Sequence, residues 1–212
     1  EIERGVLAML DTYRNTLSSD RRRLLDRYRY ADLAQKVVGV GSVGTRAWVV
    51  LMTDRDTGAP LFLQAKEAGP SVLERFAGRS KFENQGRRVV EGQRLMQAAS
   101  DIFLGWMRVT GLDGLQRDFY VRQLWDWKSS ADVESMDPRG MTIYSKLCAW
   151  TLARGHARSG DAIAIAAYLG TSDAFDKAIT RFAESYADQN ERDHVALIEA
   201  IDEGRVPAET GV

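Results

Sequence analysis

Three glycines with the spacing G-x-G-x-x-G constrain this chain more than any other feature. They are Gly39, Gly41 and Gly44, in the run "VGVGSVGTR" of residues 38–46. Glycine lets backbone amides approach phosphate groups without obstruction by a side chain, and two unrelated folds use this spacing for that purpose. In one fold the glycines follow a strand and open a helix, whereas in the other they join two strands. The residues after Gly44 therefore decide between the two folds.

Those residues favour the strand-joining use. The run "RAWVVLMTD" is rich in β-branched and aromatic residues, which are typical of a strand. The turn signal "RDTGAP" and a second strand pattern, "LFLQAKEA", follow it, so we expect a hairpin. A dinucleotide-binding unit would need a helix here, and an acidic residue at the end of a second parallel strand. The sequence supplies neither, and the pattern resembles the glycine-rich loop of protein kinases.

A kinase loop also requires a lysine on the strand after the hairpin turn and a glutamate on the next helix. Lys66 lies in "LFLQAKEA", and Glu91 lies in the helical pattern "RRVVEGQRLMQ". A lysine among apolar strand residues is costly to bury alone, so a carboxylate or phosphate partner is expected. Ser42 in the loop can donate to a phosphate, and Arg122 on the strand "FYVRQL" can face the same cleft.

A purely structural interpretation competes with this one. Glycines also serve ordinary bends and bulges, and Lys66 could lie on an exposed strand face. Glu74 and Glu83 compete with Glu91 as partners of the lysine. An acetyltransferase-like nucleotide-binding loop is a further alternative, under which the hairpin and the lysine would be coincidental.

Along the chain, hydrophobic periodicity indicates an α+β fold. We expect a helical pair over residues 1–36, with a second helix that begins near residue 20 and runs to about residue 36. A sheet lobe with one inserted helix is expected over 37–128, and a helical region over 129–212. The predicted sheet is small and mainly antiparallel, with two strands before the inserted helix and two after it.

Composition narrows the classes of partner. The 212 residues carry a formal net charge of −1, so no basic surface favours nucleic acid or an anionic membrane. The single cysteine, Cys148, excludes an intrachain disulfide and a cysteine zinc cluster, and we expect no metal site within the chain. No apolar run is long enough to span a membrane and no signal peptide opens the sequence, so the cytoplasm is the expected compartment.

Several longer runs carry a resemblance to a known family. They are "KVVGVGSVGTRAWVVLM", "LFLQAKEA", "VVEGQRLMQAASDIFLGW", "FYVRQLWDWKSSADVE" and "LARGHARSGD". Together they are similar to a bacterial family known as domain of unknown function 2252, over residues 30–195. Members of that family resemble a circularly permuted protein-kinase-like or aminoglycoside-phosphotransferase-like fold. In that fold a "GDxHxxN" catalytic loop and a metal-binding "DxND" segment precede the glycine loop.

The resemblance implies roles for particular residues. Gly39, Gly41 and Gly44 would form the phosphate flap, Lys66 would bind phosphate, and Glu91 would be its partner. The implied ligand is ATP with Mg²⁺. The resemblance therefore points to the nucleotide-binding portion of a phosphotransferase.

The chain also departs from the family pattern. It has only two histidines, His156 and His194, and neither lies in a "GDxHxxN" motif. No residue of the chain is thus expected to be catalytic, and the sequence looks like the C-terminal part of a family member. Its partner could be the missing N-terminal half or another copy of the chain. The alternative function is a non-catalytic kinase-like binding or scaffold module.

Overall fold

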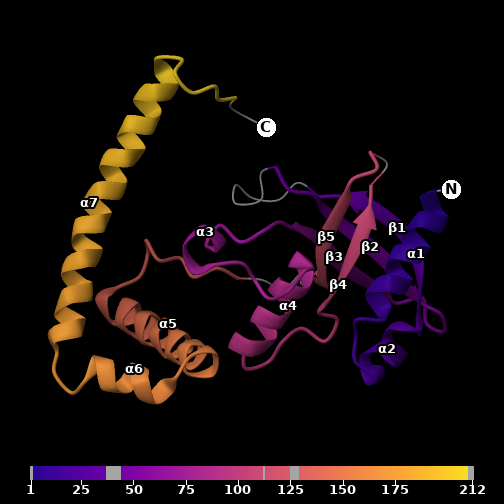
Figure 1. Ribbon diagram of the computed structural model, residues 1–212, viewed down its shortest axis with the longest axis horizontal. Helices are drawn as coiled ribbons and strands as arrows, with labels where there is room; N and C mark the ends of the chain where they lie inside the picture. The colour runs from indigo at the N-terminus through magenta and orange to yellow at the C-terminus, as the bar shows by residue number, and fades with distance from the viewer. Residues whose placement is uncertain (1, 37–43, 112, 125–128, 210–212) are drawn as a thin grey trace. The chain divides into compact units, whose positions relative to one another are not determined.

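The computed structural model describes residues 2–36, 44–111, 113–124 and 129–209, with side chains from residue 5 onward (Figure 1). The helices among them are α1 Ile2–Arg14, α2 Ser19–Leu25, α3 Glu74–Ala77, α4 Gln85–Met96, α5 Pro138–Ser159, α6 Ala162–Leu169 and α7 Ala174–Asp202. The strands are β1 Tyr28–Gln35, β2 Ala47–Asp54, β3 Pro60–Ala68, β4 Gly105–Thr110 and β5 Gln116–Gln123. By their contacts, the residues divide into two compact units, Glu1–Ser159 and Gly160–Val212.

The five strands form one antiparallel sheet in the order β1-β2-β3-β5-β4. The predicted α+β class and the antiparallel pairing are confirmed, but three strands and not two precede the inserted segment, which holds the short helix α3 as well as α4. In strand β2, half-buried and buried residues alternate from Val49 to Asp54, as the two-residue period of a strand requires. The predicted boundaries of the sheet lobe, between residues 36 and 37 and between residues 128 and 129, lie next to residues outside the described ranges.

The prediction of a helix from about residue 20 to 36 is wrong in its second half. Helix α2 ends at Leu25, and Tyr28–Gln35 is strand β1 at one edge of the sheet. The register of β1 against β2 shifts between Tyr30 and Asp32, so the strand carries a bulge. The bulge moves Leu33 onto the same face as Tyr30, and the resulting spacing of three resembles that of a helix.

The hydrophobic core lies on one face of the sheet, where α1 and α2 cover it (Figure 1). It contains Tyr13, Leu17, Leu25, Val50, Met52, Leu61, Leu63, Ala65, Phe103, Met107, Phe119 and Val121. The Tyr13 side chain is fully buried, and its hydroxyl donates to the carbonyl oxygen of Phe103 over 2.5 Å. Burial of these side chains holds the first helix to the segment that leads into β4.

The opposite face of the sheet carries α4, whose N-terminus is fixed by Asp118 of β5. The Asp118 carboxylate accepts from the Gln85 amide over 2.7 Å and from the Asn84 side-chain amide over 2.9 Å. It also pairs with Arg108 of β4, with a nitrogen–oxygen distance of 2.6 Å. A carboxylate at a helix N-terminus satisfies amides that have no partner within the helix. Asp118 therefore fixes the start of α4 on the sheet.

Helices α6 and α7 belong to the second unit. The Asp161 side chain accepts from the amides of Ile163 and Ala164 and so caps α6. Within the described ranges, no helix combines the length and the apolar character that crossing a bilayer requires.

Candidate phosphate-binding face

Of the four predicted loop residues, the structure describes only Gly44. Gly39, Gly41 and Ser42 lie outside the described residues. Gly44 has a φ of +80°, a backbone conformation that residues with a Cβ rarely adopt, and open space surrounds the position of a Cβ there. A glycine at this position is therefore required by its backbone conformation.

The strands on either side of the glycine pattern are antiparallel partners. Gln35 at the end of β1 pairs with Trp48 of β2, and the Lys36 amide donates to the Ala47 carbonyl over 2.9 Å. The glycine segment thus joins neighbouring strands of one sheet. A strand follows the glycines here, whereas a helix follows them in a dinucleotide-binding unit.

A network of ion pairs holds the first residues after Gly44. Both the Arg46 amide and its guanidinium donate to the Glu67 carboxylate of β3, over 3.1 and 3.2 Å. Arg117 of β5 lies 3.7 Å from Glu67 and forms a two-point pair with Asp113, at 2.8 and 2.6 Å. Because Arg46 also approaches Asp113 at 4.0 Å, four charges tie the end of the glycine segment to the turn before β5.

This network predicts a dependence of stability on pH. The Arg117 guanidinium, followed by the Leu115 amide, lowers the pKa of Asp113 well below its ordinary value of 3.8. A lowered folded-state pKa stabilises the fold above the unfolded-state value, and this stability is lost as pH falls from about 4 towards the folded-state pKa. Asp113→Asn should therefore lower the melting temperature at pH 7, and the difference from the parent chain should shrink by pH 2.

The measurement is a series of melting temperatures by circular dichroism between pH 7 and pH 2. Asp188→Asn, at an exposed position on α7, is the matched control and should change little at either pH. A difference between Asp113→Asn and the parent chain that stays constant down to pH 2 would contradict the assigned pairing.

Lys66 lies near the C-terminal end of β3, directly opposite Ala47 of β2 and Tyr120 of β5. Ala47 is only three positions after Gly44, so the register brings the lysine to the base of the glycine segment. The Lys66 side chain is half-buried and lies on the sheet face that carries α4. The predicted grouping of this lysine with Gly39 and Gly41 stays a prediction, because those two glycines lie outside the described residues.

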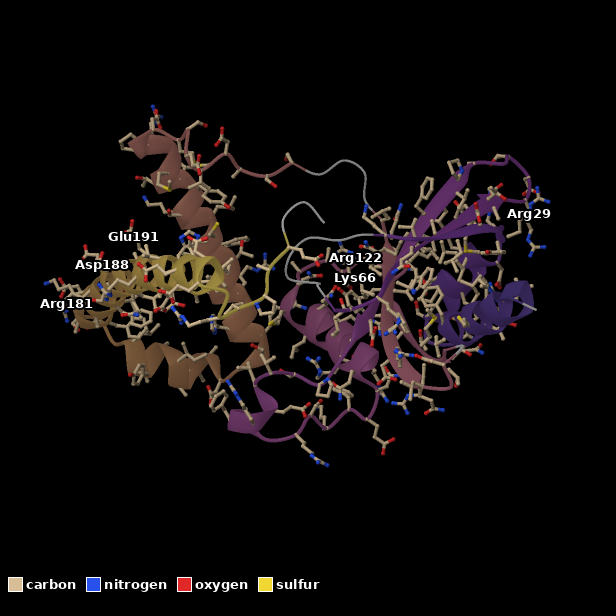
Figure 2. All side chains as sticks on the ribbon, turned by 90° about the horizontal axis from the view of Figure 1, so that it is seen from above. Arg29, Lys66, Arg122, Arg181, Asp188 and Glu191 are labelled. Carbon is tan, nitrogen blue, oxygen red and sulfur yellow. The ribbon has the colours of Figure 1, made fainter. Side chains whose placement is uncertain are left out.

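Arg122 lies on the same sheet face as Lys66. It is directly opposite Gln64, which is two residues before Lys66 on β3, so the two cations are diagonal neighbours on adjacent strands. Figure 2 shows their side chains close together near one end of the sheet. The end of β5 is held in place because the Gln123 amide donates to Asp101 over 2.8 Å. The structure therefore brings Lys66 and Arg122 together.

Sequence reasoning missed Gln64. Its side chain is only 3% exposed, although it occupies the sheet position between Val49 and Arg122. A polar residue within the apolar strand pattern "LFLQAKEA" was the available signal. The sequence does not show that Gln64 lies opposite Arg122, because that pairing depends on the register of the two strands.

Glu91 forms an ion pair within its own helix. Within the described part of the chain, its ion pair is with Arg94, one helical turn away on α4, at 3.5 Å. Arg94 also stacks on Trp106 of β4 and donates to the Leu104 carbonyl over 2.7 Å. The ion pair thus lies on the side of α4 that faces the β4 edge. A pair between Glu91 and Lys66 stays a prediction.

A pocket of about 440 Å³ lies away from this face, at the junction of α1 and α2 with the segment after α4. Arg21, Arg94 and Asp101 line it together with Thr16, Leu17, Ser18, Ser100 and Ile102. Asp101 already accepts from the amides of Phe103 and Gln123, and its charge opposes those of the two arginines. Gly44, the described residue of the glycine pattern, does not line this pocket.

Comparison with known proteins gives a family. The model of a family described as uncharacterised proteins conserved in bacteria, domain of unknown function 2252, matches residues 1–200, so the chain belongs to this family. No curated protein and no solved structure matches it significantly.

Proposed function

We propose that this member of the family binds a nucleoside triphosphate, namely ATP with Mg²⁺, on the sheet face that carries Lys66. One observation carries the proposal: the glycine pattern joins antiparallel β1 and β2, and the adjacent strand β3 places Lys66 opposite Ala47 at the base of that segment. Backbone amides of a glycine segment and a lysine ammonium are both donors that phosphate oxygens accept. The chain would be the nucleotide-binding portion of a kinase-like phosphotransferase.

Binding and phosphoryl transfer need different residues. Transfer requires a group that positions the nucleophile and carboxylates that hold the metal ion, in addition to the phosphate-binding groups. The "GDxHxxN" catalytic-loop motif of the kinase-like fold does not occur in these 212 residues. The proposal for this chain is therefore binding, with Lys66 and the glycine segment neutralising and orienting the phosphates.

A thermal-shift titration with ATP and Mg²⁺ tests the proposal. A ligand that binds only the folded state at about 100 times its Kd stabilises by about 2.7 kcal/mol, or roughly 5–10 °C in melting temperature for a chain of this size. Lys66→Ala should remove most of that shift, because it removes a cation from the phosphates.

Lys146→Ala is the matched control, since Lys146 is exposed on α5, and it should keep the full shift. An equal shift in the Lys66→Ala variant and the parent chain would contradict a role for this lysine. The absence of any shift in the parent chain would contradict nucleotide binding by these residues.

A non-catalytic binding module is the second candidate. It is favoured by a row of exposed apolar side chains at helical spacing on α7, namely Phe175, Ile179, Phe182 and Tyr186. Exposed apolar surface of this kind is typical of a surface that contacts another molecule. A parent chain that shows no nucleotide-dependent shift at any concentration would favour this candidate.

A further inference from the structure

The segment between β3 and α4 carries a cluster of strongly exposed apolar side chains. Val72 is 81% exposed and Phe76 is 76% exposed, which exceeds every other large hydrophobic side chain described in the first unit. Leu73, between them in sequence, is 61% exposed. Single exposed hydrophobic residues are ordinary on a protein surface, whereas three within five positions form a patch that is typical of a contact surface.

One helical turn holds these side chains together. The amides of Phe76 and Ala77 donate to the Leu73 carbonyl over 2.9 and 2.8 Å, so Leu73 and Phe76 lie one turn apart on the same side of α3. Gly78, with a φ of +81°, ends the turn. We call residues 71–82 the tip segment. Figure 2 shows it, in purple, as a loop at the margin of the first unit.

Both ends of the loop that contains the tip segment are fixed at the start of α4. Before it, the Gly69 carbonyl accepts from Arg88 over 2.9 Å. After it, the Asn84 side chain accepts from the Arg87 amide over 2.8 Å and donates to Asp118 over 2.9 Å. The loop is therefore anchored at its base, while its apolar turn stays in contact with solvent.

The tip segment is basic. It carries three cations, Arg75, Arg79 and Lys81, against one carboxylate, Glu74, although the whole chain has a formal net charge of −1. All three cations are exposed, and none of them forms an ion pair with another residue of the described ranges. The Arg75 guanidinium lies 4.5 Å from the centre of the Phe76 ring. Positive charge thus stands directly beside the exposed apolar side chains.

We propose that the tip segment contacts the surface of an anionic lipid bilayer. Its three apolar side chains enter the boundary between headgroups and acyl chains, and its three cations bind the lipid phosphates. Apolar burial and attraction to anionic lipid both favour such a contact, and long basic side chains keep their charges at the headgroups while their stems cover apolar surface. The proposal does not involve the glycine segment or Lys66.

A lipid surface suits this segment better than a protein partner does. A standard protein interface buries about 800 Å² of each partner and is depleted in lysine. One helical turn with three apolar side chains presents far less area than that. A bilayer requires no complementary shape, because its interfacial region accommodates a projecting apolar group of any form. The unpaired cations supply the attraction that so small an apolar surface lacks.

Co-sedimentation of the 212-residue chain with vesicles tests the proposal. One vesicle contains phosphatidylcholine alone, and the other contains phosphatidylcholine and phosphatidylglycerol in equal parts. The chain should bind the mixed vesicles more tightly than the neutral ones. This preference should weaken as salt is raised, because salt screens the charges at the bilayer surface.

The apolar contribution is tested with the double variant Leu73→Ser, Phe76→Ser. It should weaken binding to the mixed vesicles by about 10- to 100-fold, because two apolar side chains no longer leave water. Both residues are exposed, so the substitutions should leave the fold intact. Leu152→Ser is the matched control, since Leu152 is 63% exposed on α5, and this variant should bind as the parent chain does.

The contribution of charge is tested with Arg79→Gln, Lys81→Gln. Removing two cations should weaken binding to the mixed vesicles by about 10- to 30-fold and leave binding to the neutral vesicles unchanged. Lys146→Gln, at an exposed position on α5, removes a cation elsewhere and should have little effect.

Each contrary result overturns a definite part of the proposal. A parent chain that binds neither vesicle rules out the lipid contact, and self-association that is lost in Leu73→Ser, Phe76→Ser would identify a second copy as the partner instead. Equal binding by this variant and the parent chain rules out the tip segment. Equal binding to both vesicles rules out the role of the cations. Nucleotide binding depends on Lys66, so the two proposals fail independently.

Discussion

Replacing Gly86 by alanine should lower the free energy of unfolding by about 3 kcal/mol, or roughly 6–12 °C in melting temperature for a chain of this size. Gly86 lies in the first turn of α4, where the helix backbone meets β5. A Cβ on this residue would lie 2.1 Å from the Phe119 carbonyl oxygen and 2.6 Å from its carbonyl carbon. Both obstructing atoms belong to the backbone of β5, so α4 must move away from the sheet.

That movement would also strain the hydrogen bonds that fix the helix. The Gln85 amide and the Asn84 side chain both donate to Asp118, and hydrogen bonds to a charged group contribute more than neutral ones. Chemical denaturation monitored by circular dichroism measures the change.

Gly92→Ala in the same helix is the matched control for Gly86→Ala. No atom lies within 4 Å of the position of its Cβ, and alanine is favoured over glycine inside a helix by about 1 kcal/mol. The two identical substitutions should therefore act in opposite directions. If both stabilise the chain, the close approach of α4 to β5 is wrong.

Replacing Tyr13 by alanine should cost about 3–5 kcal/mol, because the largest fully buried side chain of the described core would be lost. Its hydroxyl donates to the Phe103 carbonyl over 2.5 Å, and its ring lies against Gly105 at the start of β4. Tyr13→Phe keeps the ring and removes only this donor. It should cost about 1–2 kcal/mol, as expected for a buried carbonyl left without its partner.

Tyr13 also predicts a loss of stability at alkaline pH. Burial, and then the nearby Asp101 charge, raises the pKa of the Tyr13 hydroxyl well above its ordinary value of 10.0. A raised folded-state pKa stabilises the fold below the unfolded-state value, and this stability is lost as pH rises above about 10. Denaturation at pH 8 and pH 11 should show a smaller alkaline loss for Tyr13→Phe than for the parent chain, and an equal loss would contradict this assignment.

Four of the five strands could be predicted from the sequence, since their apolar residues alternate and turn residues bound them. Strand β1 could not, because most of its side chains are exposed. Its bulge also breaks the alternation, so that Tyr28, Tyr30 and Leu33 fit a helix as well as a strand. A strand with mostly exposed side chains leaves little hydrophobic signal in a sequence.

The candidate site could be predicted in part, because several of its residues lie on strands that the sequence pattern identifies. The order of the glycines, Lys66 and Arg122 follows from the strand pattern, whereas the cross-strand position of Gln64 depends on register. Glu91 pairs with Arg94, one turn away on the same helix, and its predicted pairing with Lys66 stays a prediction. Spacing along a sequence cannot rank partners within a helix against partners across a sheet.

The bulge in β1 has a consequence for association. An edge strand presents unpaired backbone donors and acceptors to which a strand of another molecule can add. At the bulge the Asp32 carboxylate accepts from the Leu33 amide over 2.8 Å and occupies one of these donors. A bent edge with a charged side chain on its backbone is a poor template for a foreign strand. The same irregularity that conceals β1 in the sequence thus protects the open side of the sheet from edge-to-edge aggregation.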